Sequence, residues 1–184
     1  MGRKTAMHAT TSSIFMIKPK ASLLRFFYVL AICLGVSLQA HAAVTSLKKG
    51  AAVALPEFTL LDGSVITSES LKNKPVLLSF WASWCPYCAR QNPYIQKLHE
   101  QVKDSDMQVI TVSIDKEPKA ASDYVKKHKY TFNVAKFTPA IKAVFGEIKV
   151  IPLVYVFDKN SIIQEVVPGE MFEEDVLDMR KYAK

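Results

Sequence analysis

Two cysteines, Cys85 and Cys88, are the residues of this sequence best suited to covalent chemistry. They are separated by two residues in SFWASWCPYCARQNP, which covers positions 79–93 between an apolar run and a predicted helix. Such a pair can form a redox couple, supply half of a metal site, or remain as two buried thiols. The compartment bears on this choice, because a disulfide persists only in oxidising surroundings.

The first 42 residues have the pattern of a secretory signal peptide. They contain five basic residues and no acidic one, followed by the apolar run 26–38 and the small-residue cleavage site Ala40-His41-Ala42. The apolar run is short for a membrane span of about 20 residues, although an uncleaved anchor is the alternative. We therefore predict a signal peptide at 1–42, one domain at 43–184, and export to the periplasm.

Cleavage after residue 42 changes both the charge and the cysteine count. The five basic residues leave, so the formal net charge falls from +7 to +2. The remaining chain has no stripe of Lys and Arg with interleaved aromatic residues, so nucleic acid is not an expected partner. Cys33 also leaves, and the exported chain keeps only Cys85 and Cys88.

A metal or haem fits the cysteine pair poorly. A structural zinc needs four ligands, whereas the exported chain offers one pair, and His99 and His128 lack ligand spacing. Haem attachment requires His directly after the second cysteine, and Ala89 occupies that position. We expect no metal and no cofactor besides the disulfide, with two inert thiols as the remaining alternative.

Hydrophobic periodicity predicts an α/β domain with a central mixed sheet and helices on both faces. Residues 43–56 are expected to be a loosely ordered lead-in, and Asn160 is expected to make the last hairpin turn. The predicted strands are a hairpin at 58–67 and runs at 76–81, 107–115, within 130–137, 151–158 and 162–167. The predicted helices start near residue 85 and cover 118–129, 138–145 and the C-terminal segment from Phe172.

The place of the pair at a helix start gives each cysteine a role. A thiol at the helix N-terminus faces unpaired N–H groups, so its pKa falls below the free value of about 8.5. Cys85 is therefore expected to be the exposed nucleophile. Cys88, one turn later, is expected to be buried and to resolve the mixed disulfide.

The stretch FWASWCPYC, residues 80–88, closely resembles the active-site sequence of the thioredoxin superfamily, above all its exported TlpA/ResA branch. The resemblance covers roughly residues 56–184 and includes FTLLDG, the VSID after the second buried strand, and Ile151-Pro152. It implies a thioredoxin fold with an N-terminal β-hairpin extension. It also implies protein-disulfide oxidoreductase activity with Cys85 and Cys88 as the catalytic residues.

The same resemblance assigns substrate-binding residues. Pro152 matches the family's cis-proline, which holds the backbone of Ile151 open to pair with a substrate peptide beside Cys85. Trp84, Pro86 and Tyr87 would then form the apolar surround of the site, although Trp84 could instead belong to the core.

Two departures from the family pattern concern proton transfer. Thioredoxins carry a buried acid where this sequence has Ser79, and ResA-like members carry Glu where it has Gln91. Since neither acid is present, we expect protons to pass through water, Gln91 or the substrate.

Three functions remain open from the sequence. The first is a reductase of disulfides in exported proteins such as apocytochrome c or another oxidoreductase, served by a membrane electron donor or acceptor. The second is a disulfide-forming oxidase, which is less favoured because only 63 residues separate Cys88 from Pro152, too few for the helical insertion of such oxidases. The third is a non-enzymatic binding module.

Overall fold

The computed structural model describes residues 47–183, so the predicted signal peptide and Cys33 lie outside the described residues. The strands are β1 (Phe58–Thr59), β2 (Val65–Ile66), β3 (Val76–Trp81), β4 (Gln108–Ser113), β5 (Asn133–Lys136), β6 (Leu153–Phe157) and β7 (Ile163–Pro168). The helices are η1 (Glu69–Leu71), α2 (Pro86–Val102), α3 (Pro118–His128), α4 (Pro139–Phe145), α5 (Glu173–Asp178) and η2 (Met179–Tyr182), of which η1 and η2 are 3-10 turns. Each predicted element is present, with ends shifted by a few residues.

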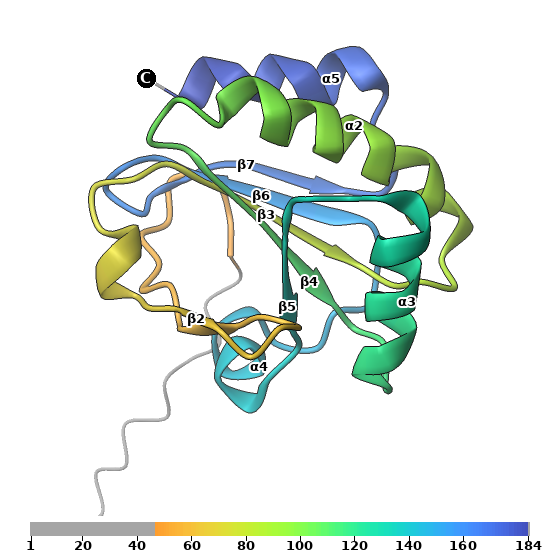
Figure 1. The fold of residues 1–184 in the computed structure, drawn as a ribbon. Coiled ribbons are helices and arrows are strands. Elements are labelled where there is room, and N and C mark those ends of the chain that lie inside the picture. Colours follow the sequence, from red (N-terminus) through yellow and green to blue (C-terminus); the bar gives the residue numbers. More distant parts are fainter. Residues whose placement is uncertain (1–46, 184) are drawn as a thin grey trace, which may run out of the picture. The chain divides into compact units, whose positions relative to one another are not determined.

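The central sheet has the strand order β5-β4-β3-β6-β7 (Figure 1). β3 lies in the middle, parallel to β4 and antiparallel to β6, and β4 and β5 are also parallel. The short β1–β2 hairpin forms a separate antiparallel pair. The prediction of a mixed sheet with an N-terminal hairpin is therefore confirmed.

Alternation along β3 divides the core into two layers. All six of its residues are buried, which explains why the sequence run is apolar on both faces. Leu77 and Trp81 face the layer packed under α2 and α5, which Figure 1 shows side by side on one face of the sheet. Leu78 and Phe80 face the layer that includes Phe145 of α4. No described helix has the length and apolarity to cross a membrane.

The N-terminal lead-in is more ordered than expected. Ile163 N–H donates to Ala51 O at 2.9 Å, and Val53 N–H donates to Ser161 O at 2.9 Å. Val53 and Leu55 are buried. The expectation of a loose lead-in is wrong for this part of the chain, because the outer edge of β7 offers unpaired backbone groups that it satisfies.

The turn between β6 and β7 also differs from expectation. Ser161, and not Asn160, adopts a left-handed backbone conformation, with φ of 58°. Asp158 holds the turn, since its Oδ1 accepts the N–H groups of Asn160 and Ile162 at 2.8 and 3.0 Å. The left-handed residue therefore follows the turn pair, as it does in hairpins with a bulge.

We expect Ser161→Gly to raise the free energy of unfolding by about 0.5–1 kcal/mol. Glycine removes a left-handed penalty of about 1–2 kcal/mol but adds about 0.4–1 kcal/mol of unfolded-state entropy. Asn160→Gly is the matched control, and it should be neutral or destabilising. Urea denaturation measures both variants, and a larger gain from Asn160→Gly would contradict the assignment.

Candidate active site

The two cysteines form a disulfide at the start of α2. Cys85 is the N-cap residue, and its Sγ accepts the N–H of Cys88 at 3.1 Å. Pro86 occupies the first helical turn, where a missing N–H costs little. The helix begins here because the sulfur accepts a free N–H group of the first turn and the proline has no N–H group that needs a partner. In the reduced protein, the same N–H group stabilises a Cys85 thiolate.

Both sulfurs are shielded in the disulfide form. Cys88 is 0% exposed, as predicted, but Cys85 is only 3% exposed. The expectation that Cys85 is openly exposed is therefore wrong. One covering group is the carbonyl oxygen of Ile151, which lies 3.9 Å from Cys85 Sγ.

The Ile151–Pro152 peptide bond is cis, as the resemblance implied. Both residues precede Leu153, where the pairing of β6 with β3 begins. Pro152 O accepts the N–H of Gly169 at 2.8 Å, which joins this segment to the end of β7. The structure thus places the Ile151 carbonyl against Cys85, although the two residues are 66 positions apart in the sequence.

The residues around the disulfide differ sharply in exposure. Trp84 is 67% exposed and Tyr87 is 55% exposed, while Pro86 is also exposed. The alternative that Trp84 belongs to the core is therefore wrong. Trp81 takes that place, since it is fully buried and its Nε1–H donates to Thr111 Oγ1 at 3.1 Å.

Asp115, which the sequence analysis did not single out, anchors the loop before Cys85. Its carboxylate accepts the Ser83 N–H at 2.9 Å and the Ser83 hydroxyl at 2.7 Å. A third bond comes from the Ser113 hydroxyl at 2.7 Å. The signal was present in the VSID segment after β4, but only the parallel pairing of β3 with β4 shows that these two strand ends meet.

Gln91 is fully buried, one turn after Cys88. Its Oε1 accepts the N–H of Met171 at 2.8 Å, and its Nε2 has no partner among the described residues. A carboxamide does not titrate near neutral pH. In this structure Gln91 joins α2 to the segment before α5 through its hydrogen bond with Met171. Its part in proton transfer stays a prediction, and the other departure, Ser79, is buried on β3.

Arg90 and Glu170 form an ion pair beside the site. Arg90 Nε and Nη2 donate to the two carboxylate oxygens at 2.7 and 2.6 Å. The hydrogen bond from Arg90 lowers the pKa of Glu170 and, reciprocally, raises the pKa of Arg90. The guanidinium carbon also lies 4.9 Å from the centre of the Tyr87 ring. Sequence analysis missed this pair because its members are 80 residues apart.

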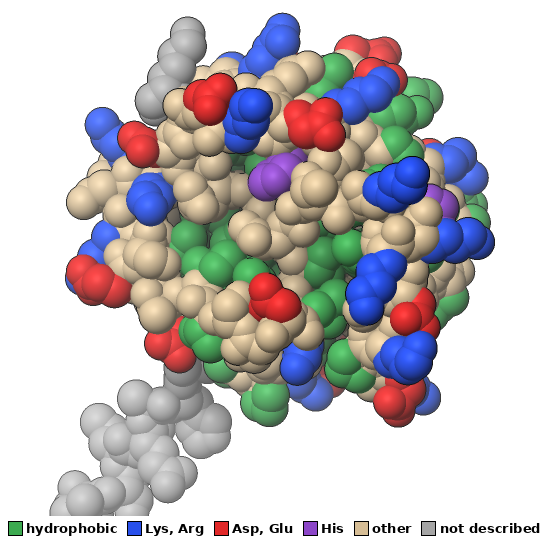
Figure 2. Space-filling view, in the orientation of Figure 1, with side chains coloured by type: hydrophobic (Ala, Val, Ile, Leu, Met, Phe, Trp, Pro, Cys, Tyr) green, Lys and Arg blue, Asp and Glu red, His purple; other side chains and the backbone are tan. Residues whose placement is uncertain are grey.

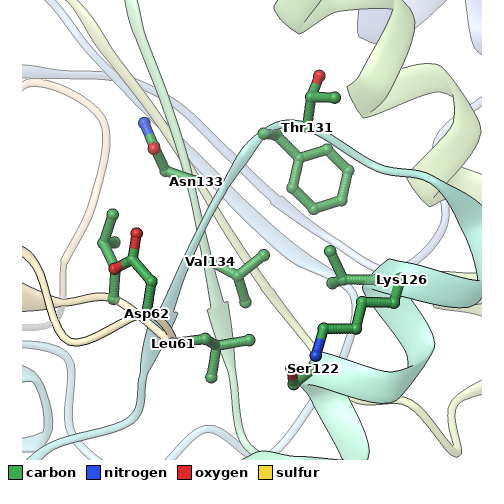
Figure 3. A pocket seen from close by; sticks show the side chains of 10 residues that line it. Leu61, Asp62, Ser122, Lys126, Thr131, Asn133 and Val134 are labelled. Atoms are coloured by element: carbon green, nitrogen blue, oxygen red, sulfur yellow. The ribbon is translucent and has the colours of Figure 1, made fainter.

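A pocket of about 400 Å³ lies away from the disulfide, between the β1–β2 hairpin, α3 and β5 (Figure 3). None of the ten residues that line it is a predicted site residue. On the face drawn in Figure 2, charged side chains of both signs are interspersed. No group of three or more potential metal ligands occurs within residues 47–183.

Comparison with known proteins places the chain in a family. The Redoxin family model matches residues 48–181. The chain belongs to the Redoxin family. Together with the cysteine pair at the start of α2, this membership makes it a thiol–disulfide oxidoreductase, and the predicted resemblance is confirmed.

Curated relatives and a solved structure agree with this placement. The chain is 28% identical over 124 residues to thiol-disulfide oxidoreductase ResA of Oceanobacillus iheyensis, covering 64% of this chain and 65% of that protein. It is 30% identical over 125 residues to ResA of Bacillus cereus, covering 66% and 71%. A thiol:disulfide interchange protein of Chlorobium tepidum superposes with a TM-score of 0.66 at 23% identity, covering 74% and 97%, and confirms the thioredoxin-like fold.

We expect Asp115→Asn to lower the free energy of unfolding by about 1–3 kcal/mol. An amide offers a single acceptor oxygen, so at least one of the three bonded donors loses its partner. Urea denaturation of the oxidised protein measures the change. Asp123→Asn, which removes an exposed ion pair with Lys119, is the control and should cost less than about 1 kcal/mol. Equal losses in both variants would contradict the anchoring role.

Proposed function

We propose that this protein reduces disulfides in exported proteins, with Cys85 as the nucleophile and Cys88 as the resolving thiol. The observation that carries the proposal is the place of Cys85 Sγ at the first turn of α2, where it receives the Cys88 N–H. An N–H group aimed at this sulfur favours the thiolate, and the thiolate is the attacking form.

The reaction consists of two exchanges. The Cys85 thiolate attacks one sulfur of a substrate disulfide, so that a mixed disulfide forms and the second substrate sulfur leaves as a thiolate that takes up a proton. The Cys88 thiol then loses its proton to solvent and attacks Cys85 Sγ, which releases the first substrate sulfur as a thiolate that also takes up a proton. Two electrons and two protons pass to the substrate, and a dithiol donor restores the enzyme by the reverse exchange.

The Ile151 carbonyl and the exposed aromatic residues support a protein as substrate. Ile151 lies beyond the paired part of β6 and beside the nucleophile, so an extended peptide can align along it. We propose that Ile151, Pro152, Trp84, Pro86 and Tyr87 contact this peptide. The site lies at the surface rather than in the pocket of Figure 3, which favours a macromolecule over a small molecule.

The proposed location is the periplasm, and the proposed substrates are apocytochrome c or another oxidoreductase. The signal-peptide pattern of residues 1–42 supports export, and the names of the ResA relatives support disulfide exchange as the chemistry. We propose a membrane dithiol as the electron donor. Fractionation of cells that express the full chain tests the location, and recovery in the cytoplasm would contradict it.

We expect the purified protein to catalyse insulin reduction by dithiothreitol, and Cys85→Ser to abolish this activity. Cys88→Ser should retain one attack and accumulate a mixed disulfide on Cys85, which mass spectrometry detects. Equilibration in glutathione buffers should give a potential nearer the value of about −270 mV for thioredoxin than the value of about −120 mV for a strong oxidase. A value at the oxidising end would favour the oxidase, and absence of turnover would favour a binding module.

Restoring an acid at position 91 tests the proton path. Burial raises the pKa of a carboxyl group above its usual value of about 4.3, and residue 91 is fully buried one turn from Cys88. Gln91→Glu should therefore add a new inflection to the pH profile of insulin reduction between pH 4 and 8. Gln101→Glu, at an exposed position of the same helix, should leave the profile unchanged. A wild-type profile for both variants would remove position 91 from the path.

A further inference from the structure

Exposed apolar side chains gather at the disulfide. Five large hydrophobic residues are exposed within residues 47–183, and three of them are Trp84, Tyr87 and Val150. Val150, 51% exposed, directly precedes Ile151, whose carbonyl contacts Cys85 Sγ. The fourth, Phe172, is the most exposed of all at 74%, and its position follows from the contacts of the chain segment before it.

Residues 169–171 bring Phe172 to the active-site end of α2. Gly169 N–H donates to Pro152 O, Glu170 pairs with Arg90, and Met171 N–H donates to Gln91 Oε1. These bonds join the segment to the cis-proline on one side and to the first two turns of α2 on the other. Phe172 is the N-cap residue of α5, which packs alongside α2 (Figure 1), and the next residue, Glu173, pairs with Lys97 of α2.

The ion pair makes this edge of the site electrically balanced. Arg90 is neutralised by Glu170 and lies against the Tyr87 ring. A charged substrate side chain gains little from a cation that is already paired, whereas an apolar side chain gains contact area from exposed rings. The composition of the edge therefore favours apolar residues in a substrate.

We propose that Phe172 is a specificity-determining residue, which binds an apolar side chain near the target cysteine of an extended polypeptide. The proposal rests on the reductase function proposed above. The group that Phe172 would bind follows from the chemistry. A substrate sulfur must come within bonding distance, about 2 Å, of the Cys85 sulfur, and Cys85 is only 3% exposed. The residues on either side of that sulfur are then held against the exposed apolar side chains around it.

Two synthetic peptides test the proposal, each with one cysteine in a disulfide with a small thiol. In one peptide leucine and phenylalanine flank the cysteine, and in the other serine flanks it. The wild-type protein should reduce the apolar peptide with the higher kcat/KM, and the preference should arise mainly in KM. Phe172→Ser should reduce this preference about tenfold, and Phe172→Leu should retain most of it.

The Ser variant is suited to the test because serine is a favoured N-cap residue, whereas Phe172 makes no side-chain cap bond. The fifth exposed hydrophobic residue, Val65, lies on β2 of the hairpin and is the matched control. Val65→Ser should keep the wild-type preference. A wild-type protein that reduces both peptides equally, or a Phe172→Ser variant with an unchanged preference, would overturn the proposal. Failure of the reductase function itself would look different, because neither peptide would then be reduced.

Discussion

The hydrogen bond from the Cys88 backbone N–H to the sulfur of Cys85 is the interaction on which the chemistry of this protein depends. It exists because α2 begins at Pro86, so that Cys85 takes the N-cap position and its sulfur accepts a helix N–H that has no other partner. Without this bond, Cys85 would be an ordinary thiol, largely protonated at neutral pH. The rest of the structure serves to place this one helix end.

Three separate links hold the helix end in position. The central strand β3 leads into the loop that Asp115 binds through two hydrogen bonds from Ser83. The segment at Ile151 and Pro152, which precedes β6, brings the Ile151 carbonyl against Cys85. Residues 169–171 bind both Pro152 and α2, so the carboxyl end of β7 connects the remaining two parts. A loss at any of these points changes the surroundings of the Cys85 sulfur.

The two positions at which the resemblance implied an acid hold neutral residues, Ser79 and Gln91. Position 91 holds a neutral carboxamide that is used for a backbone hydrogen bond to Met171. The carboxylates near the site have other partners, since Asp115 binds Ser83 and Ser113 and Glu170 binds Arg90. The hydrogen bond to the Cys85 sulfur therefore comes from a backbone N–H group and not from a charged side chain.

Local patterns determined a large part of this protein. The order of strands and helices, the helix start at the cysteine pair and the hairpin at Asp62 all follow from periodicity and from residues whose conformational preferences act over a few positions. The resemblance around FWASWCPYC added the cis bond at Pro152, which the structure contains. The turn between β6 and β7 was assigned to Asn160 and not to Ser161. Either residue can adopt the left-handed conformation, and which one does so depends on how β6 pairs with β7.

The tertiary structure determined the contacts and exposures that local sequence patterns do not predict. The Asp115 anchor, the Arg90–Glu170 pair and the place of Phe172 each join residues far apart in the chain, and sequence spacing carries no signal of such contacts. Exposure was likewise decided by packing, since Trp81 and Trp84 are three residues apart, yet one is fully buried and the other faces solvent. The sequence by itself determined that Cys85 lies at a helix end, because the residues that start a helix act locally. Which surfaces surround Cys85 depended on the sheet, because only its pairing brings distant strand ends to one edge.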